Sequence, residues 1–302
     1  MSAPTSSRFP SHLLSLLCCP ICQSALRQEP SALRCAARHA FDVARQGYVH
    51  LLPGRRPPGN ADTQSMVAAR QAFLARGHYA PLARLLAEHA ARLDATEGTE
   101  RCVLEVGAGT GYHLAHVLDR CPGQAGLAVD LSRFAARRAA RAHVRAGAII
   151  ADGERALPVR SQSVALALSV FAPRNARELH RVLRPQGALL VATPTERHLR
   201  QLIAPMGLLS VDTHKEERLH ARLRPTFEPG TRESLELDMA LTREEVFLLA
   251  AMGPSAFHVP AEELRRRADA LPARTTVTAS FTVATYHRVE PPPAPGDGPQ
   301  RR

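Results

Sequence analysis

A glycine-rich loop, VLEVGAGTG at residues 103–111, constrains the fold of this chain more than any other feature. The loop follows a short apolar run that predicts a strand, and it precedes a segment with helical periodicity. Glycines at such a point let the backbone turn tightly and approach a ligand without an intervening Cβ atom. From about residue 101 to 193, short apolar runs alternate with helical segments, which is the pattern of a doubly wound parallel α/β sheet.

The sheet is expected to end in an antiparallel pair of strands. After the parallel part, SLELDMA at 234–240 and the alternating run at 275–289 predict two strands with two helices between them. Within the parallel part, Ser132 is placed to cap a helix predicted over 133–145. The runs predicted as parallel strands are CVLEV, AGLAVD, AGAII, VALALSV and GALLVAT.

The spacing of the loop glycines distinguishes between two kinds of nucleotide ligand. Gly107, Gly109 and Gly111 form GxGxG, whereas the dinucleotide fingerprint is GxGxxG, and Tyr112 stands where that pattern requires its last glycine. The spacing therefore favours an adenosyl ligand without a pyrophosphate group.

Carboxylates follow the predicted strands in the order that an adenosyl nucleoside requires. Asp130 ends the second strand about 20 residues after the loop, where it can accept from both ribose hydroxyl groups. Asp152, at the end of the third strand, can accept from the adenine amino group, and Glu105 lies beneath the loop near the amino-acid end of the ligand. One carboxylate alone is more typical of a solvated strand end, but the three together predict an adenosyl pocket. With LPVRSQSVALALSVFAP and LHRVLRPQGALLVATP, this stretch resembles class I S-adenosylmethionine-dependent methyltransferases over roughly residues 100–200.

Cysteines and a histidine near the N-terminus have the spacing of a metal site. Cys19, Cys22, Cys35 and His39 form C-x2-C-x12-C-x3-H, which provides two close ligand pairs for a tetrahedral structural zinc ion. All coordination positions would be filled, so catalytic zinc is disfavoured. Cys18 could replace Cys19 with looser spacing. The remaining cysteines, at positions 102 and 121, are expected to be ordinary buried apolar residues.

The charge balance points to a polyanionic partner. The chain has 39 lysines and arginines against 28 acidic residues, a net charge of +11. No stretch approaches the length of uncharged apolar sequence that a membrane helix needs, and the first ten residues lack a signal-peptide core, so we expect a cytoplasmic protein.

The patterns divide the chain into regions of different character. Apolar residues at helical spacing predict helices near 66–74 and 82–93, after the breaker-rich stretch PGRRPPGN. A module of about 40 residues cannot bury enough surface to fold alone, so zinc would supply its folding free energy. The expected regions are a zinc-binding module at 11–52, a linker with helices at 53–98, a methyltransferase domain at 99–289 and a disordered tail at 290–302.

Several motifs together extend the resemblance to one family. CPIC, CAARHAFDVARQGYVHLL, MVAARQAFLARGHYAPL, EVGAGTG, VFAPRNARELHRVLRP and ATPTERHL resemble the RlmA family of large-subunit rRNA guanine-N1 methyltransferases, from about residue 18 to 287. FAPRN, DTHKEERL and AMGPSAFH are most similar to its type II branch. The resemblance implies methyl transfer from S-adenosylmethionine to N1 of a guanine in a hairpin loop of 23S rRNA, and resistance to macrolides such as tylosin.

The resemblance also implies roles for particular residues. It places the four zinc ligands on the cysteine and histidine cluster above, and Gly109 and Thr110 on the donor-binding loop. Tyr79 and His198 fall on further donor-pocket positions, although the residues alone predict a packing tyrosine at a helix end and a solvated histidine. Glu105 stands where the family often has aspartate. Family members can pair, so a homodimer is left open.

The acceptor side is less specified by the sequence. Guanine N1 carries a proton at neutral pH, and its Watson–Crick edge must be unpaired, which favours a hairpin-loop base splayed into the pocket. The candidates for a catalytic role are Phe171, which could stack on the base, Pro173 and His198, and the base that removes the proton is not identified.

Arginines outside the pocket are the candidates for holding RNA. The better-placed arginines are those near the zinc cluster and linker: Arg38, Arg45, Arg55 and Arg56. The arginines of the basic helix at 133–145 are weaker candidates, because a run of arginines on a helix is more typical of a solvated face.

Two alternatives remain at this point. The methyltransferase core alone would permit a small-molecule methyltransferase of antibiotic or quinone biosynthesis, which the zinc cluster and the charge disfavour. A non-catalytic zinc RNA-binding protein is disfavoured by the intact adenosyl pattern.

Overall fold

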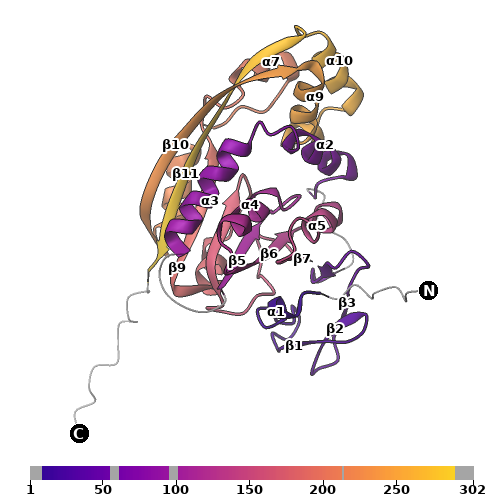
Figure 1. Ribbon diagram of the computed structural model, residues 1–302, viewed down its shortest axis with the longest axis vertical. Coiled ribbons are helices and arrows are strands. Elements are labelled where there is room, and N and C mark those ends of the chain that lie inside the picture. The colour runs from indigo at the N-terminus through magenta and orange to yellow at the C-terminus, as the bar shows by residue number, and fades with distance from the viewer. Residues whose placement is uncertain (1–8, 55–60, 95–100, 213, 290–302) are drawn as a thin grey trace.

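The computed structural model describes residues 9–54, 61–94, 101–212 and 214–289. Their main element is a sheet of eight strands in the order β10-β11-β9-β8-β5-β6-β7-β4 (Figure 1). The strands are β4 (Val49–His50), β5 (Arg101–Val106), β6 (Gln124–Asp130), β7 (Ala146–Ile150), β8 (Val164–Val170), β9 (Leu183–Pro194), β10 (Phe227–Thr242) and β11 (Arg274–Arg288).

The predicted sheet is confirmed in both of its parts. Strands β9, β8, β5, β6, β7 and β4 run parallel, while β11 pairs antiparallel with β9 and β10 pairs antiparallel with β11. The parallel strands are almost entirely buried, as expected where both faces of a sheet are covered. The sheet is therefore the expected doubly wound parallel sheet with a late antiparallel pair, and strand β4 is added at one edge.

The helices cover the two faces of the sheet and the far end of the long hairpin. They are α1 (Ser11–Leu14), α2 (Gln64–Leu74), α3 (Ala80–Asp94), α4 (Tyr112–Arg120), α5 (Arg133–Ala139), α6 (Ala176–Val182), α7 (Arg200–Met206), α8 (Lys215–Leu223), α9 (Arg243–Ala251), the 3-10 helix η1 (Pro254–Phe257) and α10 (Ala261–Asp269). The helices predicted from the patterns near 66–74 and 82–93 correspond to α2 and α3. Helices α7 and α8 were not predicted.

The helix predicted over 133–145 is wrong in its length. Helix α5 begins after Ser132, whose hydroxyl accepts from the backbone N–H groups of residues 134 and 135, but it ends at Ala139. The chain must then turn to enter β7. Arg145 is held away from a continued helix, because its guanidinium donates to the carbonyl oxygens of Cys121 and Pro122, at 2.9 and 2.8 Å, beyond the end of α4. Tertiary contacts thus override the helical composition of this segment.

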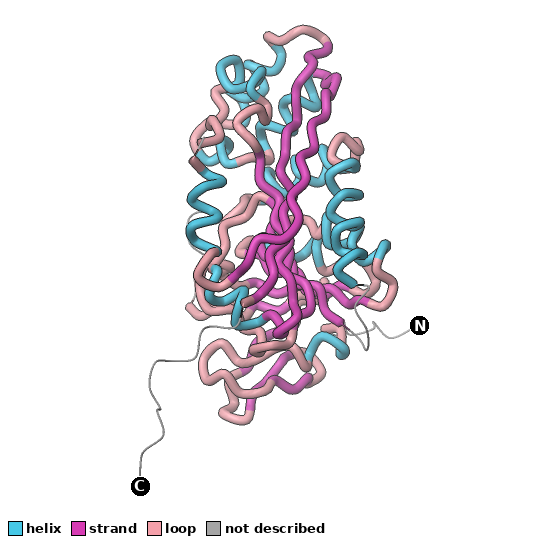
Figure 2. The backbone as a smooth tube through the Cα atoms, turned by 90° about the vertical axis from the view of Figure 1, so that its left-hand side faces the viewer, coloured by secondary structure: helices cyan, strands magenta, loops and turns pink. Residues whose placement is uncertain are grey.

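The hairpin of β10 and β11 extends beyond the parallel strands, and Figure 2 shows it running to the far end of the molecule between layers of helices. Helices α7 and α10 contact each other there, α9 contacts α10, β10 and η1, and α2 reaches across to α9. Phe281 and Val277 of β11 are fully buried in this region. The hairpin therefore carries a helical cap over the carboxyl ends of the parallel strands.

The N-terminal residues form a small sheet that is joined to the body of the molecule. Its strands are β1 (Leu26–Gln28), β2 (Ala32–Cys35) and β3 (Ala40–Asp42), all antiparallel. The Cys18 N–H donates to the Pro158 carbonyl oxygen at 3.1 Å. Leu13 and Leu33 belong to the same buried cluster as the inner residues of the parallel strands. The segment predicted as a zinc module thus shares a core with the large sheet and gives it strand β4.

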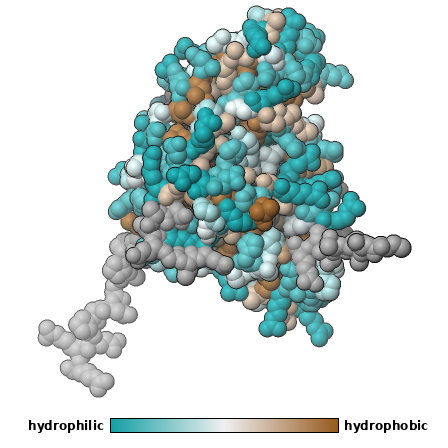
Figure 3. All heavy atoms as spheres, in the orientation of Figure 1, coloured by the Kyte–Doolittle hydropathy of each residue, from teal (hydrophilic) through white to brown (hydrophobic). Residues whose placement is uncertain are grey.

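The outside of the molecule is mostly hydrophilic on the face shown in Figure 3, where hydrophobic side chains appear singly or in small groups. Within the described ranges, none of the helices has the length and apolar character that crossing a bilayer requires. The tail predicted to be disordered lies outside the described residues.

A capping box at the start of α9 should be a measurable source of stability. The Thr242 hydroxyl accepts from the Glu245 N–H at 3.3 Å, and the Glu245 carboxylate accepts from the Thr242 N–H at 2.9 Å. We expect Thr242→Ala to lower the free energy of unfolding by about 1 kcal/mol, because the Glu245 N–H loses the hydroxyl oxygen that accepts from it. Urea unfolding would measure this, with Thr242→Ser as the control that keeps the hydroxyl. Equal losses in the two variants would contradict the assignment.

Candidate functional site

The sheet reverses its winding at β5, and a large cavity opens at this point. Strand β5 lies between β6 on one side and β8 on the other, and the glycine loop directly follows it. In open parallel sheets, ligands bind outside the carboxyl ends of the strands where the winding reverses. The cavity has a volume of about 600 Å³. The predicted site residues that line it are Tyr79, Glu105, Gly107, Gly109, Thr110, Asp130, Asp152, Phe171, Pro173 and His198.

The loop glycines have left-handed backbones and close neighbours. The φ angles of Gly107, Gly109 and Gly111 are 69°, 54° and 76°, which side-chain-bearing residues rarely adopt. A Cβ atom on Gly107 would lie 2.4 Å from the Ala172 Cβ atom, in the turn that follows β8. Gly111 does not line the cavity, because its α-carbon packs against α5, where a Cβ atom would meet Ala139 at 3.0 Å. The loop therefore requires glycine at these positions for different reasons.

Asp130 joins the glycine loop to the next helix. One carboxylate oxygen accepts from the Gly109 N–H and the other from the Ser132 N–H, both at 2.8 Å. Each oxygen can accept a second hydrogen bond, so the group can still bind two hydroxyl groups. Burial raises the pKa of Asp130 to about 6, against the lowering effect of the two N–H donors. Its position at the end of β6 is the one predicted for a ribose ligand.

Glu105 lies almost completely buried beneath the loop. Its side chain accepts from the Leu114 N–H at 3.2 Å, in the first turn of α4. Burial raises its pKa to about 8, and the nearby charge of Asp130 adds a smaller increase. At this pKa the carboxyl group is largely protonated at neutral pH. A cationic ligand in the cavity would favour its ionised form.

Asp152 follows β7 on the other side of the cavity. One of its oxygens accepts from the Glu154 N–H at 2.9 Å, and the other lies 3.3 Å from Nε of Arg155. This turn holds the carboxylate at the cavity wall beside Ala151. The three predicted carboxylates thus meet in one cavity although they come from separate strands.

An aromatic cluster forms another wall of the cavity. The fully buried ring of Phe281 lies 5.3 Å from those of Tyr79 and Phe171 and 4.8 Å from that of His198, measured between centroids. The packing role that the residues alone predicted for Tyr79 is therefore present, and its ring also lines the cavity. Burial raises the pKa of the Tyr79 hydroxyl, which stays protonated. Phe281 was not predicted as part of the site.

His198 has its ring orientation fixed by the backbone of β11. Its Nδ1 atom accepts from the Ser280 N–H at 3.2 Å. In the neutral ring the proton is then on Nε2, which makes that nitrogen a donor. The side chain lines the cavity and is not the solvated histidine that the residues alone predicted.

Arg70 and Asp62 also line the cavity, and they were not predicted. The Arg70 guanidinium donates to the Asp62 carboxylate and, at 2.8 Å, to the Met252 carbonyl oxygen, so it links α2 to the cap. A Cβ atom on Gly109 would lie 3.2 Å from its Nη1 atom. One signal was present in the sequence, because Arg70 falls on the apolar stripe of α2 between Met66 and Leu74. An arginine on such a stripe needs a partner inside the fold.

The cap completes the cavity with segments that carry no recognisable motif. Residues 208–212, between α7 and α8, and residues 252–255, around η1, line it from above. The hydroxyl of buried Ser255 accepts from the Leu209 N–H at 3.0 Å and so joins these segments. Their place at the cavity depends on how the cap helices pack, which no local pattern records.

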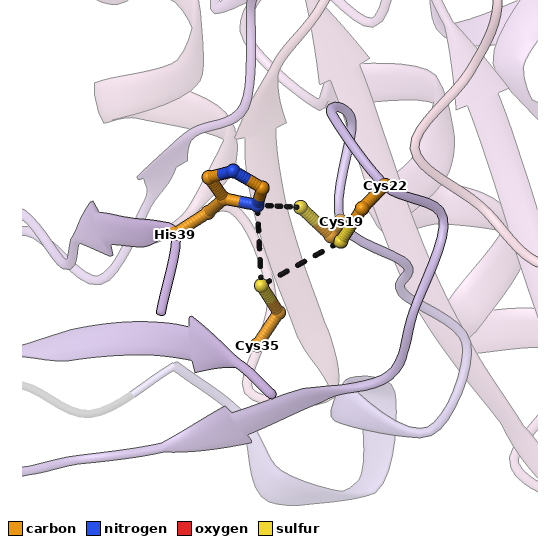
Figure 4. A group of neighbouring side chains, drawn as sticks. All are labelled: Cys19, Cys22, Cys35 and His39. Carbon is orange, nitrogen blue, oxygen red and sulfur yellow. Dashed lines mark hydrogen bonds between the residues drawn. The ribbon is translucent and has the colours of Figure 1, made fainter. Parts of the chain in front are cut away.

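The predicted zinc ligands come together in the N-terminal region (Figure 4). The ligand atoms of Cys19, Cys22, Cys35 and His39 all lie within 4.8 Å of one another. The Cys22 and Cys35 sulfur atoms are 3.7 Å apart, and His39 Nδ1 lies 3.5 and 3.3 Å from the sulfur atoms of Cys19 and Cys35. In a tetrahedral site with Zn–S bonds of about 2.3 Å, neighbouring ligand atoms are about 3.5–3.8 Å apart. The side chains present therefore fit a zinc ion.

Cys18 lies outside this group, which removes it as an alternative to Cys19. Its sulfur atom donates to the side-chain oxygen of Gln23 at 3.2 Å. By contrast, hydrogen bonds from the side chain and backbone of Ser24 lower the pKa of Cys22 to about 6. The thiolate is the form that binds metal. Cys102 and Cys121 are buried, as expected.

Family comparisons match the two parts of the chain separately. Residues 17–56 match the zinc-ribbon model described as "RlmA, N-terminal", and residues 103–187 match a methyltransferase domain model. Among solved structures, the MccD protein superposes with a TM-score of 0.48 at 15% identity, over 69% of this chain and 98% of that one. The fold, the cavity and the cysteine cluster define a class I S-adenosylmethionine-dependent methyltransferase with a structural zinc site.

Curated relatives match nearly the whole chain. The 23S rRNA (guanine(748)-N(1))-methyltransferase of Streptomyces fradiae is 48% identical over 90% of this chain and 96% of its own length. A protein of Micromonospora griseorubida, assigned to the same class of enzyme, is 47% identical over 92% of this chain and 99% of its own length. The chain belongs to the RlmA family of 23S rRNA (guanine-N1)-methyltransferases, as its motifs predicted.

The zinc content of variants should distinguish Cys35, a member of the ligand group, from Cys18, which lies outside it. We expect Cys35→Ser to lose most of the single equivalent of zinc and to unfold at lower temperature, because a ligand of the site is removed. Cys18→Ser should keep the full equivalent, since Cys18 is not in the ligand group. Elemental analysis and thermal unfolding would measure both. Zinc loss in Cys18→Ser, or retention in Cys35→Ser, would contradict the ligand assignment.

The buried carboxyl group of Glu105 should make stability depend on pH. A pKa of about 8 in the folded protein, against an ordinary value of 4.5, means that stability falls as pH rises through this window, because only the unfolded chain ionises freely. Glu105→Gln cannot ionise. We therefore expect its free energy of unfolding, without donor, to rise relative to the wild type between about pH 5 and pH 8. Urea unfolding at a series of pH values would measure this. If the free energies of unfolding of the two proteins changed in parallel with pH, the raised pKa of Glu105 would be contradicted.

Proposed function

We propose that the protein transfers a methyl group from S-adenosylmethionine to N1 of a guanine in a hairpin loop of 23S rRNA. The observation that carries the proposal is the match to the Streptomyces fradiae enzyme, which extends over both the zinc ribbon and the methyltransferase core. The cavity supports it, because it combines a nucleoside-binding edge with an aromatic wall.

The donor side of the cavity is assigned from its hydrogen-bonding capacity. We propose that Asp130 accepts from the ribose hydroxyl groups and that Asp152 accepts from the adenine amino group. Glu105 and the glycine loop at Gly107 to Thr110 would hold the amino-acid end, with Tyr79 closing the pocket. When bound, the donor supplies an electrophilic methyl group on a sulfonium, and the residues around it act mainly by positioning.

The acceptor side is assigned to the turn after β8. Phe171 has 38% of its surface exposed at the cavity, and its ring can stack on a splayed base, with Pro173 beside it. His198 is a poor candidate for the base that removes the N1 proton, because its Nδ1 atom already accepts a hydrogen bond. We propose instead that it orients a ligand group by donating from Nε2.

The zinc region is proposed to hold the RNA outside the cavity. Arg38 and Arg45 are exposed there, and the net charge of +11 favours a polyanion. The other two arginines predicted for this role, at 55 and 56, lie outside the described residues. We further propose macrolide resistance as the biological role, and a homodimer as the assembly, which sedimentation would test.

Primer extension on 23S rRNA tests the reaction directly. Expression of the protein should produce a new reverse-transcriptase stop next to one guanine, because a methyl group on N1 blocks pairing. An RNA without any new stop would refute the proposed substrate.

The proposed role of Asp130 is tested by donor binding. Asp130→Asn should weaken S-adenosylmethionine binding by about 10- to 100-fold, since hydrogen bonds to a charged group are lost. Calorimetry would measure this, with Asp269→Asn on the exposed end of α10 as the control.

A further inference from the structure

The turn after β8 has a backbone conformation that must be held in place. Phe171 has a φ angle of 56°, in the left-handed region that a side chain disfavours. Its N–H donates to the Ala192 carbonyl oxygen on β9 at 3.1 Å, which fixes only the start of the turn. Strained residues of this kind persist only when their surroundings determine them fully, and they are concentrated at functional sites.

Arg174 fixes the rest of the turn. Its Nη2 atom donates to the Ala172 carbonyl oxygen at 2.8 Å, and its Nε atom donates to the Ser169 hydroxyl at 3.0 Å. Ser169 is fully buried, and its hydroxyl points to the same carbonyl oxygen at 3.4 Å. Burial lowers the pKa of Arg174 to about 10, so the guanidinium remains charged at neutral pH. The planar fork of this side chain thus ties the last residues of β8 to the middle of the turn.

The turn contacts both sides of the cavity. Ala172 packs against Gly107, where a Cβ atom on the glycine would lie only 2.4 Å away. One residue earlier, the Phe171 ring is supported by the buried Phe281 ring at 5.3 Å. A shift of the turn would therefore move the aromatic surface relative to the glycine loop.

We infer that Arg174 is a positioning residue for methyl transfer: it holds the 171–173 turn so that Phe171 presents the acceptor base at a fixed distance from the donor loop. The inference rests on the proposed function. In-line transfer needs reacting atoms about 3–3.5 Å apart, and a misplacement of about 1 Å can cost roughly a hundredfold in rate. Arg174 itself would not contact the reacting atoms, because its hydrogen bonds are made to the turn and to β8.

Steady-state kinetics of the zinc-loaded full chain, with a 23S rRNA transcript and S-adenosylmethionine, test this role. A lysine has no planar fork, so Arg174→Lys should lower kcat by at least about tenfold. The KM for RNA and the calorimetric Kd for S-adenosylmethionine should change less than about twofold, because the binding groups remain. Ser169→Ala should also lower kcat, but by a smaller factor. This second variant keeps the role testable if Arg174→Lys does not fold.

Arg177→Ala is the matched control, since Arg177 is an exposed arginine on the neighbouring helix α6. It should leave kcat unchanged. The role is overturned if kcat of Arg174→Lys and Ser169→Ala falls only with the folded fraction, or if donor affinity falls in step with kcat. A wild-type protein that leaves no methyl group on the RNA contradicts the proposed function, whereas an active wild type with an unimpaired Arg174→Lys variant overturns only the role of Arg174.

Discussion

The contact between the glycine loop and the turn after β8 is the constraint on which the rest of the site depends. Gly107 and Ala172 approach so closely that no side chain fits between them. The contact is set by topology, because β8 lies beside β5 and their carboxyl ends meet at the same edge of the sheet. It joins the proposed donor side of the cavity to the proposed acceptor side. In a reaction that depends on alignment, such a junction controls the distance between the reactants.

The cavity is closed by parts of the chain that lie far from the sheet in sequence. The long hairpin carries the cap helices, and Arg70 connects α2 to this cap through the Met252 carbonyl oxygen. The zinc region is similarly integrated, since Leu13 and Leu33 share a buried cluster with the parallel strands. Loss of the metal would therefore disturb a core that extends to the sheet, and not only a peripheral module.

Much of the fold and part of the site were predictable because their signals are local. Apolar runs bounded by turns specified the parallel strands and the late antiparallel pair. The spacing of Cys19, Cys22, Cys35 and His39 specified the metal cluster, and Asp130 was recognisable from its place after a strand. The helix over 133–145 was predicted too long because composition does not show where the chain must turn back. Helices α7 and α8 were missed, since neither begins with a clear cap or motif.

The sequence by itself determined the winding of the sheet, the edge of the sheet at which the cavity opens and the residues of the metal-binding group. These depend on periodicity and on short spacings, which are properties of neighbouring residues. Only the tertiary structure decided that Phe281 lies behind Phe171, that Arg70 links α2 to the cap, and that His198 turns Nδ1 toward the backbone of β11. Those contacts join residues separated by many turns of chain. They form because burial and hydrogen-bond satisfaction are optimised over the whole core, which no single segment encodes.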